Sequence, residues 1–120
     1  MEFQETNLLD ALTEAFNQHD ARGMMALMTE DCVFENTYPP PNGTRYEGWK
    51  IVKKFWEEFF RSSSQARIEI EDMFTSQERG VQRWTYHGVD AEGNAGHVRG
   101  VDIFRFRQGK IAEKLSYVKG

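Results

Sequence analysis

The sequence lacks the features that define several large classes of protein. It has one cysteine, Cys32, so no intramolecular disulfide can form, and it has no CxxC, HExxH, P-loop or GxGxxG motif. It has no apolar run long enough for a membrane span, and its first residues, MEFQETNLLDAL, are acidic where a secretory signal would be basic. From these absences we expect a cytoplasmic protein that holds no metal or cofactor and makes no membrane contact.

Basic charge is also scarce and is not clustered. Lys and Arg total 15 against 19 for Asp and Glu, which gives a formal net charge of -4. Because binding to a phosphate backbone needs clustered Lys and Arg, we expect no nucleic-acid partner. Aromatic residues, at 13% of the chain, are by contrast abundant and suit a core that wraps around a cavity. A length of 120 residues predicts one domain, residues 1–120.

Apolar residues in the first half of the chain recur with the period of a helix. In residues 5–18 they follow the i, i+3, i+4 spacing, and in residues 49–60 they form a wide apolar stripe. Asp20 is a suitable N-cap for a short helix between these two segments. Helices are therefore predicted over residues 5–18, 20–28 and 49–60.

Strand patterns dominate the second half. From residue 66 onward apolar and polar residues alternate, and turns that contain glycine separate the alternating segments. Strands are predicted over residues 32–36, 66–76, 81–88, 97–107 and 110–119. Helices followed by a meander of antiparallel strands predict an α+β fold, in which the helices cover one face of a strongly twisted sheet and a cavity opens at its end.

A proline-rich loop, residues 37–46, separates the first predicted strand from the third helix. Its consecutive prolines, residues 39–41, remove amide donors and fix φ, so the segment is neither helix nor central strand. The loop is either the rim of the cavity or a surface crossover. Cys32, just before it, has no nearby histidine to activate it, so we expect a buried structural thiol.

Three segments carry a resemblance to a known family: residues 16–36 (FNQHDARGMMALMTEDCVFEN), residues 48–60, and residues 101–117 (VDIFRFRQGKIAEKLSY). In these the chain resembles the nuclear transport factor 2-like superfamily, in its SnoaL-like and ketosteroid-isomerase-like branch. The resemblance implies a cystatin-like cone, with N-terminal helices packed on a strongly curved, mainly antiparallel sheet that encloses a pocket. The family includes isomerases, polyketide cyclases, epoxide hydrolases, dehydratases and many non-enzymatic domains, so the fold does not fix the chemistry.

The resemblance also implies a partly altered active site. Asp102 matches the position where ketosteroid isomerases hold the carboxylic acid of the oxyanion hole. The general base of those isomerases falls on Asn36, their tyrosine on Leu12, and the key carboxylate of SnoaL-like cyclases on Ser116. The expected catalytic residues are therefore Asp102 and Lys114, which form either a structural ion pair or a pair that orients or activates a ligand.

Around this pair we expect a small apolar molecule to bind. The resemblance and the strand alternation together give the expected ligand-binding residues Phe16, Asn36, Trp56, Arg83, Thr85, Phe104 and Ser116, with Met28 and Phe34 as further walls. If the domain is an enzyme, we expect an isomerase-like or lyase-like proton transfer at a carbonyl or hydroxyl, without a cofactor. The alternative is a non-enzymatic module for ligand sensing or dimerisation with a filled pocket. Among the histidines, His87 is expected nearest the cavity mouth.

The outer sheet face is expected to be apolar and to pair two copies of the chain. Alternation assigns to it Trp84, Tyr86, Val101, Ile103, Leu115 and Tyr117. Because so much apolar surface favours burial, and because the resemblance implies dimers formed sheet to sheet, we expect a bacterial homodimer. One alternative is an inverted face assignment, in which Trp84 and Tyr86 line the cavity.

Overall fold

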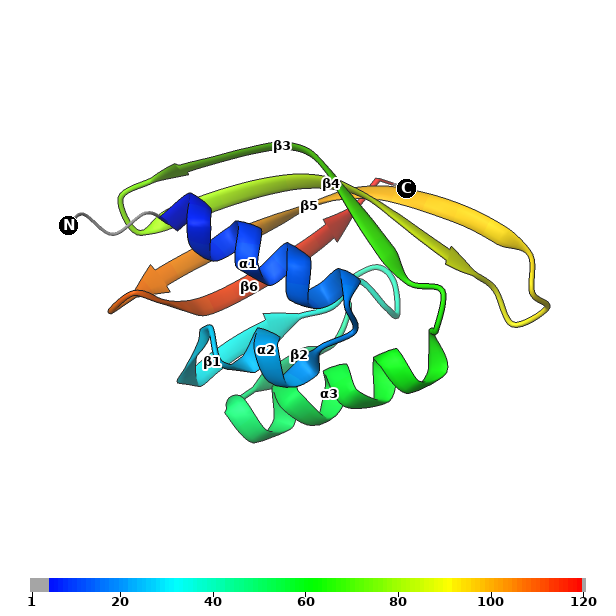
Figure 1. Cartoon of the computed structure of the whole chain (residues 1–120), viewed down its shortest axis with the longest axis horizontal. Coiled ribbons are helices and arrows are strands. Elements are labelled where there is room, and N and C mark those ends of the chain that lie inside the picture. The colour runs from blue at the N-terminus through cyan, green and yellow to red at the C-terminus, as the bar shows by residue number, and fades with distance from the viewer. Residues whose placement is uncertain (1–4, 120) are drawn as a thin grey trace.

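The structure, a computed structural model, describes residues 5–119 and consists of helices packed on one curved sheet (Figure 1). The elements in chain order are α1 (Glu5–Asn17), α2 (Ala21–Met25), β1 (Met28–Glu35), β2 (Arg45–Glu47), α3 (Trp49–Ser62), β3 (Arg67–Ser76), β4 (Arg79–Val89), β5 (Ala95–Arg107) and β6 (Lys110–Val118). Among these residues no helix has both the length and the apolar character that crossing a membrane requires.

The helices form where the apolar spacing predicts them. α1 buries the stripe Leu8, Leu9, Leu12, Ala15 and Phe16, and α3 buries Val52, Trp56 and Phe60. Asp20 caps α2, since its Oδ1 accepts a hydrogen bond of 2.9 Å from the backbone N–H of Gly23. α2 ends before the predicted boundary, because Met28 already pairs with Ile111 of β6 and the Ile111 N–H donates to the Leu27 carbonyl.

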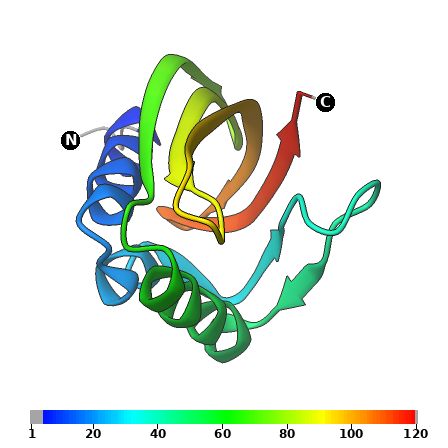
Figure 2. The ribbon, with the colours of Figure 1, turned by 90° about the vertical axis from the view of Figure 1, so that its right-hand side faces the viewer.

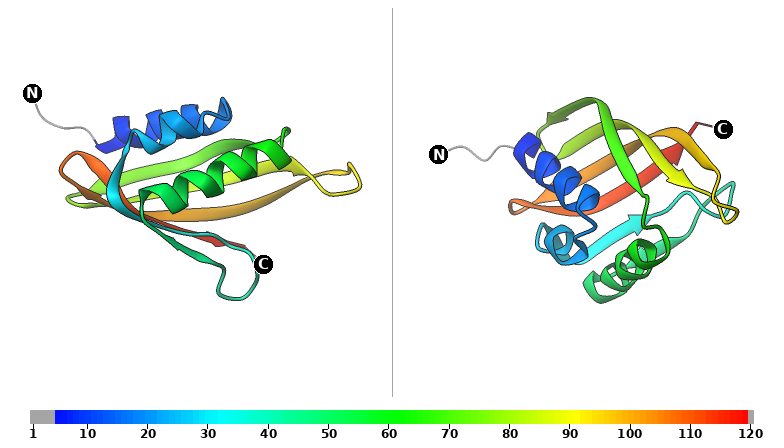
Figure 3. Two further views of the ribbon diagram at one scale, coloured as in Figure 1. Left: turned by 90° about the horizontal axis from the view of Figure 1, so that it is seen from below. Right: turned by 45° about the vertical axis from the view of Figure 1, so that its right-hand side comes forward.

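The sheet has the strand order β2-β1-β6-β5-β4-β3, with a parallel pairing between β1 and β6 and antiparallel pairings elsewhere. It curls strongly without closing, and the helices lie on its concave side (Figures 2 and 3). α1 packs against β3, and α3 packs against β1 and β2. The predicted α+β, cystatin-like architecture is confirmed.

The register of β4 decides which side chains point into the cone. Gln82 lies opposite Asp102, and Trp84 lies opposite Gly100, in an uninterrupted antiparallel pairing. Directly opposed residues share a face, so Gln82, Trp84 and Tyr86 lie with Asp102 on the concave side. The prediction that put Trp84 and Tyr86 on the outer face was wrong, and the alternative face assignment is correct.

The base of the cone is a packed apolar core. Phe104 is fully buried there and stacks on Phe106, with ring centroids 6.3 Å apart. Cys32 is buried in the same core, as predicted, and this burial raises the pKa of its thiol to about 11. The thiol therefore stays protonated at neutral pH and serves only for packing, because the thiolate is the nucleophilic form.

Candidate functional site

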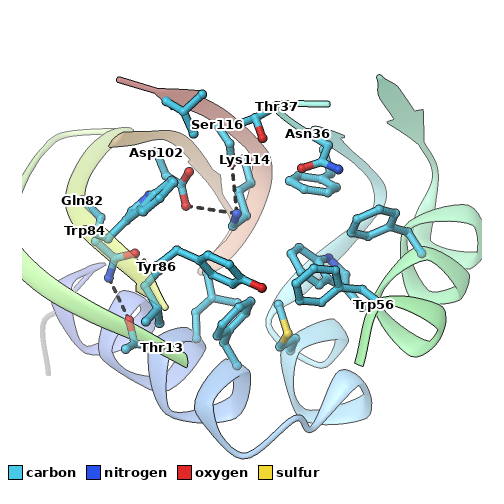
Figure 4. Close-up of a pocket in the computed structure, with 18 of the residues that line it drawn as sticks. Thr13, Asn36, Thr37, Trp56, Gln82, Trp84, Tyr86, Asp102, Lys114 and Ser116 are labelled. Carbon is cyan, nitrogen blue, oxygen red and sulfur yellow. Dashed lines mark hydrogen bonds and ion pairs between the residues drawn. The ribbon is translucent and has the colours of Figure 1, made fainter. Parts of the chain in front are cut away.

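A cavity of about 270 Å³ lies between the concave face of the sheet and helices α1 and α3 (Figure 4). Its walls are mostly apolar, and their aromatic residues include seven that come from four elements: Phe16, Phe34, Phe55, Trp56, Phe59, Trp84 and Tyr86. Its polar lining residues are Thr13, Asn36, Thr37, Gln82, Asp102, Lys114 and Ser116. This combination of an apolar hollow with a few convergent polar groups is typical of small-molecule sites.

The aromatic walls are fixed by contacts among themselves. Trp56 packs edge-on against Phe16, with centroids 5.8 Å apart, and lies 4.9 Å from the Phe34 ring. Trp84 lies across β5, where Gly100 leaves it room: a Cβ at Gly100 would lie 2.6 Å from the indole Cη2 of Trp84. Burial also raises the pKa of the Tyr86 phenol, so this hydroxyl stays protonated as a donor.

The principal polar feature of the cavity wall is an ion pair between Asp102 on β5 and Lys114 on β6. Lys114 Nζ lies 3.0 Å from Asp102 Oδ2, and the two side chains are only 11% and 3% exposed. The same Nζ donates to Ser116 Oγ at 3.2 Å and lies over the rings of Phe34 and Trp56, 4.7 and 5.3 Å from their centroids. A carboxylate, a hydroxyl and two ring faces thus hold the ammonium in one place.

Three buried polar atoms around this cavity have no hydrogen-bond partner among the described residues: Asp102 Oδ1, Trp56 Nε1 and Trp84 Nε1. Leaving a buried donor or acceptor unpaired costs about 1–3 kcal/mol. Such groups are rare in native proteins, and a catalytic role or a bound polar molecule is among the explanations for them. Their concentration in the walls of one cavity therefore marks it as the candidate site.

Comparison with known protein families assigns the chain to one of them. Residues 9–114 match the family described as SnoaL-like domain. The chain belongs to the SnoaL-like family. Comparison of this SnoaL-like domain with curated proteins finds no match.

Solved structures agree with this assignment. The domain is 33% identical to an NTF2-like protein of unknown function from Mesorhizobium loti, with a TM-score of 0.80 over 96% of this chain and 90% of that one. It is 25% identical to a candidate polyketide cyclase from Xanthomonas campestris pv. campestris, with a TM-score of 0.79 over 95% and 89% of the two chains. A protein with a ketosteroid isomerase-like fold from Catenulispora acidiphila, 13% identical, has the same fold, with a TM-score of 0.82 over 92% and 83%.

Most of the site residues expected from the sequence meet in the SnoaL-like cavity. Six of them line it: Phe16, Asn36, Trp56, Asp102, Lys114 and Ser116. Phe34 lines it as well, whereas Met28 and Phe104 are buried in the core outside the lining. Phe104 is therefore a corrected assignment: it is fully buried in the core, where it stacks on Phe106.

Arg83 and Thr85 are the other corrections. Both lie on the convex face, where Thr85 Oγ1 donates to Glu71 Oε2 at 2.5 Å and Arg83 Nε lies 3.7 Å from Glu71 Oε1. Arg99, at 2.7 Å, is the main partner of this carboxylate, and together these groups lower the pKa of Glu71 to about 2. His87 also lies outside the lining and pairs with Glu69 at 2.5 Å.

The sequence does not identify Gln82, Thr37 or Tyr38 as lining the site, and it places Trp84 and Tyr86 there only in the alternative face assignment. Gln82, Trp84 and Tyr86 alternate along β4, and that alternation would have identified them had the register with β5 been known. Thr37 and Tyr38 belong to the proline-rich loop and border the cavity, and Tyr38 is 72% exposed. The loop is therefore the rim of the cavity and not a plain crossover.

Proposed function

We propose that this SnoaL-like domain binds a small, mostly apolar molecule with a carbonyl or hydroxyl group and catalyses a proton transfer on it. The observation that supports this best is the buried Asp102–Lys114 pair in the wall of an otherwise aromatic cavity. The two charged side chains are themselves buried, so a polar contact between them and a ligand is stronger than the same contact in bulk water.

The cavity limits the size of the ligand. An engineered apolar cavity of about 150 Å³ holds benzene. A volume near 270 Å³ therefore suits a molecule of one or two rings. Aromatic walls favour a flat or cyclic ligand, because stacked and edge-on ring contacts add to the free energy of burying apolar area.

The ion pair supplies both groups that an enolisation needs. Lys114 Nζ, which uses two of its N–H groups on Asp102 and Ser116, has a third for the carbonyl oxygen of a ligand. The Asp102 carboxylate, which lines the cavity, accepts the proton when the C–H bond beside the carbonyl breaks. The electron pair then moves to the carbonyl oxygen, where the ammonium stabilises it, and the proton returns to another carbon.

This function predicts that the domain exchanges hydrogens beside a ligand carbonyl. With beta-tetralone, a two-ring ketone, we expect a rise in the unfolding temperature and accelerated hydrogen exchange in deuterated water, followed by NMR. Asp102→Asn should slow that exchange about a hundredfold, since general-base catalysis contributes at least that much. The surface change Asp10→Asn is the matched control. No temperature shift with any apolar ketone would reject the binding proposal.

A second function is favoured by one observation. Asn36 and Ser116 line the cavity where the family's usual acid and base positions fall, and neither takes a proton at neutral pH. A ligand-sensing domain without turnover would raise its unfolding temperature with beta-tetralone and leave hydrogen exchange at the rate in buffer. The two measurements together therefore separate the enzyme from the sensor.

We also propose that the convex sheet face pairs two copies of the domain. After the correction for β4, its apolar residues include Val101, Ile103, Leu115 and Tyr117 on β5 and β6, and Val81 and Phe74 on β4 and β3. Tyr117 and Phe74 are 51% and 56% exposed, so this face leaves aromatic surface that a second copy can cover. Replacing Ile103 and Tyr117 with glutamate should convert a dimer to monomers in light scattering, and an unchanged mass would exclude this interface.

A further inference from the structure

A second polar anchor stands in the cavity wall beside the ion pair. Gln82 on β4 is directly opposite Asp102 in the sheet, is only 2% exposed, and lines the cavity. Buried glutamine side chains are usually bonded at both ends of the carboxamide. Here one end is fixed by the protein and the other is not.

The orientation of the Gln82 carboxamide follows from its partner. Thr13 Oγ1 on α1 donates its hydrogen to the Leu9 carbonyl at 3.0 Å, so it can only accept from Gln82. Gln82 Nε2 therefore faces Thr13, at 2.9 Å, and also lies 3.7 Å from Met73 Sδ. This leaves the carboxamide oxygen as the end that points away from α1 and into the cavity (Figure 4).

The oxygen is free and accessible. No side chain or backbone donor among the described residues bonds to Gln82 Oε1. This oxygen is also not among the three fully buried atoms without a partner that were named above, so it borders the open space. The Asp102–Lys114 pair beside it has no net charge, so the cavity wall does not favour a charged ligand. A fixed, neutral acceptor in such a wall selects an O–H or N–H donor.

We infer that Gln82 Oε1 is a specificity-determining contact, and that the ligand is a neutral ring compound with two polar ends. One end is a carbonyl for Lys114, as in the proposed function on which this inference rests, and the other is a hydroxyl or N–H for Gln82. Thr13 acts as a positioning residue, since its hydroxyl holds the carboxamide in the orientation that presents the oxygen.

Titration calorimetry with acetophenone and its ortho, meta and para hydroxy derivatives tests this inference. At least one hydroxy isomer should bind the wild-type domain about threefold to tenfold more tightly than acetophenone, which is the usual contribution of one hydrogen bond. Gln82→Met should remove that gain, so that the hydroxy isomer binds the variant no more tightly than acetophenone does. Gln65→Met makes the same chemical change on an exposed loop and should retain the gain.

Thr13→Val gives a second, independent variant, because it releases the carboxamide without removing it. It should reduce the ratio of the affinity for the hydroxy isomer to the affinity for acetophenone. If no isomer binds better than acetophenone, or if the gain survives in Gln82→Met, the role of Gln82 is wrong while the proposed ketone binding stands. If acetophenone and its derivatives all fail to bind, the proposed function fails and the inference fails with it.

Discussion

Replacing Lys114 with methionine should lower the free energy of unfolding by about 3–5 kcal/mol, because it leaves the Asp102 carboxylate buried without its cation. Asp102 is 2% exposed, and its Oδ1 already lacks a partner among the described residues. Removing Lys114 would take away the ionic contact that Oδ2 makes at 3.0 Å. Urea unfolding followed by circular dichroism measures the loss.

Two further variants isolate the cause of that loss. The double variant Asp102→Asn, Lys114→Met should recover most of the stability, since a neutral buried side chain does not need a counter-ion. Lys53→Met breaks an exposed pair with Glu57, at 2.8 Å, and should change stability by less than about 1 kcal/mol. A Lys114→Met protein as stable as the wild type would show that Asp102 does not depend on Lys114.

Phe34→Ala should destabilise the domain by about 3–5 kcal/mol, the range for truncating a buried phenylalanine. Phe34 is 2% exposed on β1, and its ring touches Trp56 and Phe55, with centroids 4.9 and 5.2 Å away. Lys114 Nζ also lies over the face of the Phe34 ring, 4.7 Å from its centroid. Truncation therefore opens the cavity and removes a support of the ion pair.

Ile51→Ala is the surface control for this prediction. Ile51 lies on α3, away from the convex sheet face, and is 53% exposed, so its truncation leaves no internal cavity. We expect the free energy of unfolding to change by less than about 0.5 kcal/mol, as for surface substitutions in general. Urea unfolding curves of the two variants compare them directly. A loss under about 1 kcal/mol for Phe34→Ala would contradict the packing described for the aromatic wall.

The helices and the last hairpin could be predicted from the sequence because their signals are local. Leu8, Leu12 and Phe16 repeat with the helical period, and that stripe is buried in α1. In the hairpin, Asp102 and Lys114 fall on the same face through the alternation of β5 and β6. These two elements positioned the ion pair, which is the centre of the candidate site.

The face of β4 could not be derived in the same way. Alternation separates Trp84 and Tyr86 from Arg83 and Thr85, but only the pairing with β5 decides which set points inward. That register is set across the turn at residues 90–94, where the Asp90 N–H donates to the Asn94 carbonyl and the Gly93 N–H to the Asp90 carbonyl. The role of Gln82 depended on the same register, so it too became visible only in three dimensions.

The early start of β1 had a similar cause. Met28 joins the sheet through a parallel pairing with Ile111, a residue 83 positions further along the chain by subtraction of their numbers. A contact between residues so far apart in the sequence cannot be predicted from local propensity. Here the pairing with β6 overrode the helical pattern of the methionine-rich segment.

The central claim is that the Asp102–Lys114 pair and the aromatic walls bind a small ketone inside the cavity. A crystal structure of the domain soaked with para-bromoacetophenone tests it most directly, since the anomalous signal of bromine locates the ligand without bias. We expect the ring between Phe16, Phe34 and Trp56, and the carbonyl oxygen within hydrogen-bonding distance of Lys114 Nζ. A cavity filled by its own side chains, or bromine found only on the outer surface, would contradict the claim.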